Sequence, residues 1–110
     1  MPPPELKPAS PLRPGDQATI TMTIRNHEDK PVSLTPAATP LLGSNGERIA
    51  PQLLEFTPTQ LQLNPGQQQE LRITITVPAR CGNGSYAGLL VVSGVDYLRA
   101  VITVEVSARG

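Results

Sequence analysis

The sequence is poor in cysteine, histidine, aromatic residues and net charge. It contains one cysteine, one histidine, no tryptophan, one phenylalanine and two tyrosines. Because Cys81 is the single cysteine, an internal disulfide is excluded. Nine basic residues balance nine acidic ones, so the chain has neither a positive excess that could follow a phosphate backbone nor a set of rings on which bases could stack. We therefore expect no nucleic-acid partner.

Long hydrophobic runs are also missing. The longest apolar stretch, residues 86–92, is far shorter than the ~20 residues of a membrane-spanning helix. No charged start followed by an apolar run marks a signal peptide. We therefore expect a soluble chain without a membrane span.

Length and composition are those of one ordinary globular domain. The chain has 110 residues, of which 38% are hydrophobic and 16% charged, enough for one core. We divide it into a proline-rich N-terminal segment or edge strand, residues 1–9, and a single folded domain, residues 10–110.

The pattern that recurs is alternation of apolar and polar residues between turn signals. Thirteen prolines and nine glycines punctuate the chain, and almost no segment has helical periodicity. Alternation predicts half-buried strands. The seven expected strands are residues 6–12, 18–24, 32–35, 60–63, 71–77, 87–92 and 98–106.

Two of these strands and one irregular region carry further expectations. Residues 87–92 are apolar on both faces, which predicts a central strand covered on both sides. Residues 6–12 contain Pro8 and Pro11 and therefore read as an edge strand. Residues 39–57 are the least regular part of the chain, with a hairpin or loop tip at residues 43–46.

An internal repeat predicts the topology. The sequence LRPGDQ at residues 12–17 reappears 51 residues later as LNPGQQ at residues 63–68, and an alternating strand follows each copy in the same phase. Proline followed by glycine favours a type II turn. We expect the two strands to lie side by side in one sheet. Seven strands arranged in this way predict an all-β fold, an immunoglobulin-like antiparallel β-sandwich with Greek-key connections.

Residues 10–107 carry a family resemblance. The strand–loop–strand unit of residues 17–34, the FTP sequence of residues 56–58, the second Pro-Gly turn and the GSYAG sequence of residues 84–88 resemble bacterial immunoglobulin-like modules of the NEW3, fibronectin-like or pilus-chaperone-like type. The resemblance implies that Tyr86 begins the sixth strand and that its hydroxyl fixes the adjoining loop. It also implies a periplasmic, secreted or cell-surface location. The chain lacks the buried tryptophan and the cysteine pair of antibody domains.

The sequence offers no candidate for a catalytic, cofactor-binding or metal-binding residue. The acidic residues fall in turns or on polar strand faces, where they are expected to be solvated. His27, Glu28 and Asp29 form one ligand-bearing loop, which is too little for a metal site. Cys81 lies in a loop without any local signature of a nucleophile. The sequence alone does not decide whether Cys81 and His27 come together as a catalytic pair. We therefore expect no enzyme.

Surplus apolar residues on the outward faces of strands indicate where a partner could bind. Leu89, Val91, Tyr97 and Val101 exceed what one buried face needs. They either lie beneath residues 39–57 or form a subunit contact. The function favoured is a noncatalytic protein-interaction or structural module that could self-associate. The alternative is a carbohydrate-associated module of a secreted hydrolase, but the chain has few rings for stacking against sugars.

Overall fold

A computed structural model describes residues 5–94 and 99–107. Strands make up nearly all of its regular structure, and one short 3-10 helix lies among them. In chain order the elements are β1 (Glu5–Leu6), β2 (Gln17–Arg25), β3 (Val32–Ala38), β4 (Leu41–Gly43), β5 (Arg48–Ile49), η1 (Pro51–Leu53), β6 (Leu54–Thr57), β7 (Leu61–Leu63), β8 (Gln68–Thr76), β9 (Gly84–Ser93) and β10 (Arg99–Val106).

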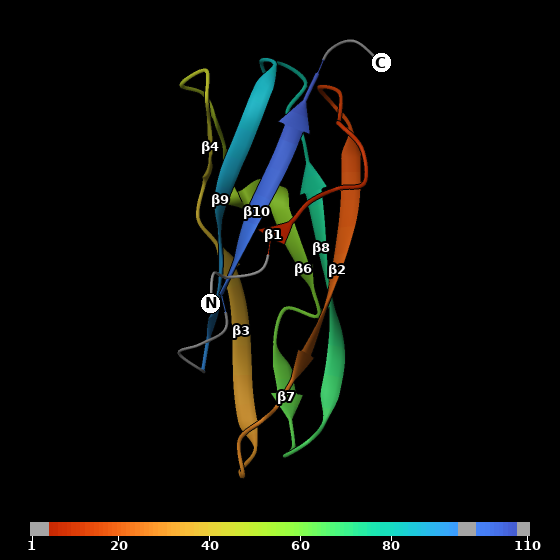
Figure 1. The fold of residues 1–110 in the computed structure, drawn as a ribbon, viewed down its shortest axis with the longest axis vertical. Coiled ribbons are helices and arrows are strands. Elements are labelled where there is room, and N and C mark those ends of the chain that lie inside the picture. The colour runs from red at the N-terminus through yellow and green to blue at the C-terminus, as the bar shows by residue number, and fades with distance from the viewer. Residues whose placement is uncertain (1–4, 95–98, 108–110) are drawn as a thin grey trace.

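The strands form two sheets that face each other (Figure 1). The larger sheet has the order β1-β10-β9-β3-β7, and β4 also pairs with β9 and carries β5 on its other side. The smaller sheet has the order β2-β8-β6. Pairing is antiparallel except for β1, which runs parallel to β10. This arrangement places β9 at the centre of the larger sheet and β8 at the centre of the smaller one.

The core lies between the sheets, where alternation turns one side of every long strand inward. On β8, for example, Leu71, Ile73 and Ile75 are fully buried while Arg72 is exposed. Burial of such side chains is the main force that stabilises the fold, at roughly 25 cal/mol per Å² of apolar surface. The largest fully buried side chain is Tyr86.

The two Pro-Gly turns are confirmed in the structure. Gly15 and Gly66 have φ angles of 88° and 77°, which a side chain rarely tolerates and glycine adopts freely. The amide of Asp16 donates to Arg13 O over 2.9 Å, and that of Gln67 to Asn64 O over 3.0 Å. A positive φ at the third position together with this closing bond is the pattern of a type II turn.

The strands after these turns do pair with each other, in a nearly symmetric way. β2 and β8 are antiparallel over their full length, with Ile20 opposite Ile73. At one end the Gly15 amide donates to Val77 O, and at the other end the Gly66 amide donates to Asn26 O, each over 2.9 Å. The repeat in the sequence therefore encodes two equivalent units, each a Pro-Gly turn followed by a strand, which pair about a local two-fold axis.

Six of the seven expected strands are present, the strand expected over residues 6–12 is not, and the irregular region contains more regular structure than the sequence indicates. Residues 39–57 contain β4, β5, η1 and β6, which are too short to show a period in the sequence. The tip at residues 43–46 is a hairpin turn, closed by the Gly46 amide donating to Gly43 O over 3.1 Å. The edge segment 6–12 forms only the end of β1 and an isolated bridge from Leu12 to Val106.

Candidate interaction surface

The outward face of β9 is apolar and open to solvent. Leu89 is 41% exposed and Val91 is 39% exposed, while their neighbours Leu90 and Val92 are buried. The expectation that this strand is covered on both faces is therefore wrong for the described structure. Residues 39–57 do not lie over it, because β4 and β5 extend the larger sheet sideways and β6 joins the smaller sheet.

Neighbouring strands widen this apolar strip. Directly opposite partners in antiparallel strands point to the same face of a sheet. Val101 of β10 lies opposite Leu89, Ala37 of β3 lies opposite Val91, and Leu42 of β4 lies opposite Ala87. Leu42 is 60% exposed. We call the set Ala37, Leu42, Ala87, Leu89, Val91 and Val101 the outer apolar face.

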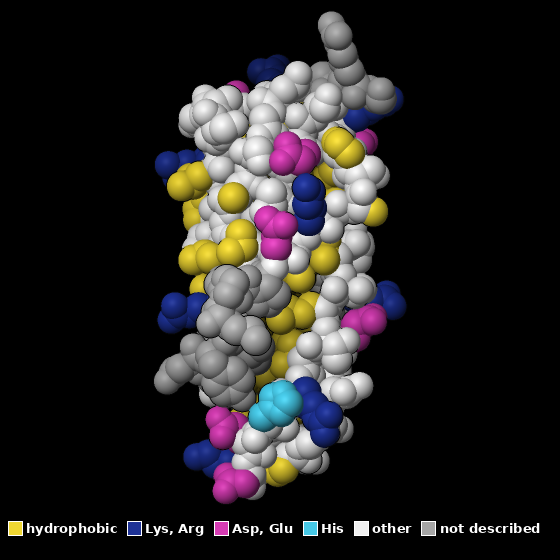
Figure 2. All heavy atoms as spheres, in the orientation of Figure 1, with side chains coloured by type: hydrophobic (Ala, Val, Ile, Leu, Met, Phe, Trp, Pro, Cys, Tyr) yellow, Lys and Arg dark blue, Asp and Glu magenta, His cyan; other side chains and the backbone are white. Residues whose placement is uncertain are grey.

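Part of this face is visible as a cluster of hydrophobic side chains over β4, at the left of Figure 2. Leu42 was missed in the sequence because it belongs to a three-residue strand, and the adjacent Leu41 is the buried member of the pair. Of the residues proposed from the sequence, Val101 is half-buried beside Leu89. Tyr97 lies outside the described residues.

The hairpin that carries Leu42 is fixed by a polar cluster around the Tyr86 hydroxyl. The hydroxyl lies 2.8 Å from Gly82 O and 3.0 Å from Glu47 Oε2, and these two acceptors share its one proton. Asn45 Nδ2 donates to the hydroxyl over 3.0 Å, and the Gly82 amide donates to Glu47 Oε2 over 2.6 Å. We call Asn45, Glu47, Gly82 and Tyr86 the Tyr86 cluster. The expectation that this hydroxyl fixes the adjoining loop is confirmed.

Close packing at Gly43 lets the hairpin lie against Tyr86. A Cβ at this position would lie 2.7 Å from Tyr86 Cε2 and 2.6 Å from Asn45 Oδ1, distances that real Cβ atoms do not reach. Gly43 is also the residue of β4 that lies opposite Tyr86. The small residue after Leu42 thus places that leucine in register with Ala87 on the outer apolar face.

Burial and hydrogen bonding change the acidity of Tyr86. Burial is the largest cause, and contacts with Cys81 and Glu47 add to it, so the pKa of Tyr86 rises to about 12 from its usual 10.0. Asn45 acts in the opposite direction by donating to the hydroxyl oxygen. A phenol that is neutral in the fold keeps its hydrogen bond to the loop at neutral pH.

This shift predicts alkaline destabilisation through Tyr86. The pKa is higher in the folded than in the unfolded chain, so the stabilisation is complete below pH 10 and is lost as the pH rises from 10 towards 12. Thermal unfolding of the wild type and of Tyr86→Phe should therefore differ most near pH 8 and converge above pH 11. Any effect of the ionisation of Tyr97 is common to both proteins, since both contain this residue, and it cancels in the difference. A difference that stays constant across this range would contradict the assignment.

The two residues considered for nucleophilic chemistry lie at opposite ends of the smaller sheet. His27 follows the end of β2, near the turn at Gly66, whereas Cys81 follows the end of β8, near the turn at Gly15. β2 and β8 are antiparallel, so these ends are separated by the length of the strands. Cys81 is half-buried against the core. The structure thus does not bring these two side chains together.

Within residues 5–94 and 99–107, no three residues among His, Cys, Asp and Glu cluster in a way that could hold a metal ion. The same residues include no helix of the length and apolarity needed to cross a bilayer.

Several solved structures have a similar fold. A family 123 glycoside hydrolase from Clostridium perfringens contains a region that matches 94% of this chain with a TM-score of 0.80 and 13% identity. A PapD-like domain of human CEP192 matches 98% of the chain with a TM-score of 0.73 and 16% identity. The Escherichia coli chaperone DraB matches 98% with a TM-score of 0.61 and 18% identity. The fold is an immunoglobulin-like β-sandwich.

The extent of these matches differs. The chain spans 23% of the hydrolase, 84% of the CEP192 domain and 53% of the DraB chaperone. No family model matches the sequence, and no curated protein matches it. At identities below 20%, the likeness concerns the fold alone.

Proposed function

We propose that the chain is a noncatalytic protein-interaction module whose outer apolar face binds another protein domain. The observation that carries the proposal is the exposure of Leu42, Leu89 and Val91 on one face of the larger sheet. Adjacent exposed apolar residues on a soluble domain are typical of a contact site. We also propose that the chain is a NEW3-like module and that it comes from a bacterium.

Rigidity supports this role. The outer apolar face lies on paired strands rather than on a loop, and the Tyr86 cluster fixes the hairpin that carries Leu42. A surface that is ordered before binding loses little conformational entropy when a partner docks. The Escherichia coli chaperone DraB shares the fold, and a chaperone is a protein whose function is to contact other proteins.

Photo-crosslinking in the producing cells tests the proposal. A photoreactive phenylalanine derivative at Leu89 should form a discrete protein adduct, because this side chain would lie inside the interface. The same group at Gln62, an exposed residue of β7, is the matched control and should give no adduct. Equal labelling from both positions, or none from Leu89, would refute binding through this face.

A second candidate is an accessory module of a secreted carbohydrate enzyme. It is favoured by the match to a region of the Clostridium perfringens glycoside hydrolase, where the likeness covers 94% of this chain. In that case the Leu89 adduct would be a hydrolase polypeptide, and the outer apolar face would pack on its catalytic domain. A glycan panel separates this docking role from direct sugar binding, for which the described surface supplies few rings.

A further inference from the structure

One edge of the smaller sheet is unpaired over the full length of β2. The sheet ends at this strand, which pairs with β8 on one side and with no described strand on the other (Figure 1). The N-terminal strand β1 does not cover the edge, because it pairs with β10 of the other sheet. A nine-residue edge is thus left without a partner in the described structure.

The bonds at the end of β2 show which of its amides point outward. Asn26 directs both backbone groups at the β8 side: its amide donates to Gln67 O, and its carbonyl accepts from Gly66, each over 2.9 Å. This direction alternates along an antiparallel strand. The even-numbered residues of β2 therefore bond to β8, and the backbone groups of Thr19, Thr21 and Thr23 point away from it.

The other edges are guarded and β2 is not. Proteins protect exposed edges by making them short or by placing proline or lysine on them. β1 and β5 have two residues each, β7 has three, and β6 has four and is followed by Pro58. β2 has neither proline nor lysine, and its one charged residue is Arg25, at its end.

The β2 sequence is complementary to itself. We propose that two copies of this chain pair antiparallel through β2, with Thr21 opposite Thr21 of the second copy. Thr19 then lies opposite Thr23 of the other copy, and these outward-pointing residues exchange about six backbone hydrogen bonds. The two three-stranded sheets would join into one continuous sheet. This inference is independent of the outer apolar face, which lies on the other sheet.

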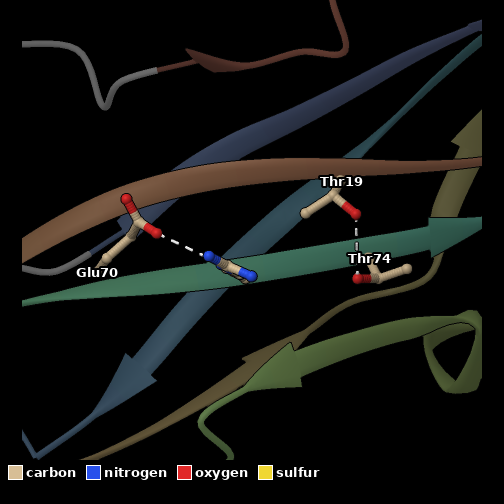
Figure 3. A network of polar contacts seen from close by, with 4 residues as sticks. Thr19, Glu70 and Thr74 are labelled. Atoms are coloured by element: carbon tan, nitrogen blue, oxygen red, sulfur yellow. Dashed lines mark hydrogen bonds and ion pairs between the residues drawn. The ribbon is translucent and has the colours of Figure 1, made fainter.

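Charge and burial favour this register. Arg25 would lie opposite Gln17 of the second copy and next to its Asp16. The strand's one positive charge would then be close to an acidic residue and not opposite Arg25 of the second copy. On the inner side, Ala18 and Met22 are only half-buried at the free edge and would gain apolar neighbours. The outer side would be polar, as in the pair Thr19 and Thr74, whose hydroxyl oxygens are 3.4 Å apart (Figure 3).

Light scattering after size-exclusion chromatography, over a concentration series up to about 1 mM, tests the pairing. The wild type should dimerise reversibly. Thr21→Pro should raise the dimer dissociation constant about thirtyfold, because each copy loses one outward N–H. Proline removes no bond to β8 at this position and is tolerated on edge strands. Gln62→Pro, on the edge strand β7 of the other sheet, is the matched control and should leave the dissociation constant unchanged.

A charge exchange tests the register without relying on proline. Thr21→Lys places two lysines opposite each other and should weaken the dimer, whereas an equimolar mixture with Thr21→Glu should restore it as a heterodimer. Thr19→Lys should have a smaller effect, because its opposite residue is Thr23. A wild type that stays monomeric, as it would if the edge binds a strand of a different protein, overturns the proposal. So does a dimer that Leu89→Lys abolishes and Thr21 variants leave intact.

Discussion

Replacing Ile73 by alanine should lower the free energy of unfolding by about 3 kcal/mol, the largest effect expected here. Ile73 is fully buried on the central strand of the smaller sheet, opposite Ile20 on one side and Phe56 on the other. Truncation removes apolar contacts and leaves a cavity that the paired strands cannot close. Urea unfolding followed by circular dichroism would measure the change.

Arg72→Ala is the matched control for this variant. Arg72 precedes Ile73 but points to the opposite face, where its ion pair with Glu70 is largely exposed. Exposed pairs contribute little, so the change should stay below about 0.5 kcal/mol. If the two variants were equally destabilising, the assignment of the inner and outer faces of β8 would be wrong.

Asn26→Ala should destabilise the protein by about 2 kcal/mol, although the residue is polar and follows a strand. Asn26 is only 2% exposed. Its Nδ2 donates to Lys30 O over 2.9 Å and to Leu63 O over 3.0 Å, and its Oδ1 accepts from the Glu28 amide. Alanine leaves these backbone groups without their partner, and the Leu63 carbonyl is buried where water cannot replace it.

Asn64→Ala provides the comparison, since Asn64 occupies the first position of the neighbouring Pro-Gly turn and is exposed. Chemical denaturation should show a change within about 0.5 kcal/mol for this variant. An Asn26→Ala protein as stable as Asn64→Ala would show that the buried amide does not join β2, β7 and the loop between β2 and β3.

The sequence was informative wherever a pattern repeats. Alternation located β2, β8 and β10, and the Pro-Gly repeat correctly predicted the pairing of β2 with β8. These features are local, or they depend on a period of two that a single sheet face imposes. The hydrogen bond of the Tyr86 hydroxyl to its loop was expected from the family resemblance and is present.

The remainder depends on contacts between distant residues. β4 and β5 are three and two residues long, and the place of β4 beside β9 is held by the Tyr86 cluster, which joins residues about 40 positions apart. The apolar residues of β9 suggested a covered strand, because a doubly buried strand and one with an exposed binding face have the same composition. Leu42 could not be assigned to that face without the pairing of β4 with β9.

The most direct test of the proposed function is photo-crosslinking from Leu89 in two backgrounds, the wild type and Leu42→Lys. Leu42 and Leu89 lie on the same outer apolar face, and a lysine at the exposed position 42 should leave the fold intact. We predict a discrete protein adduct in the wild type and its loss in the Leu42→Lys background. An adduct of unchanged identity and yield in both backgrounds would contradict the claim that this face binds a partner as one surface.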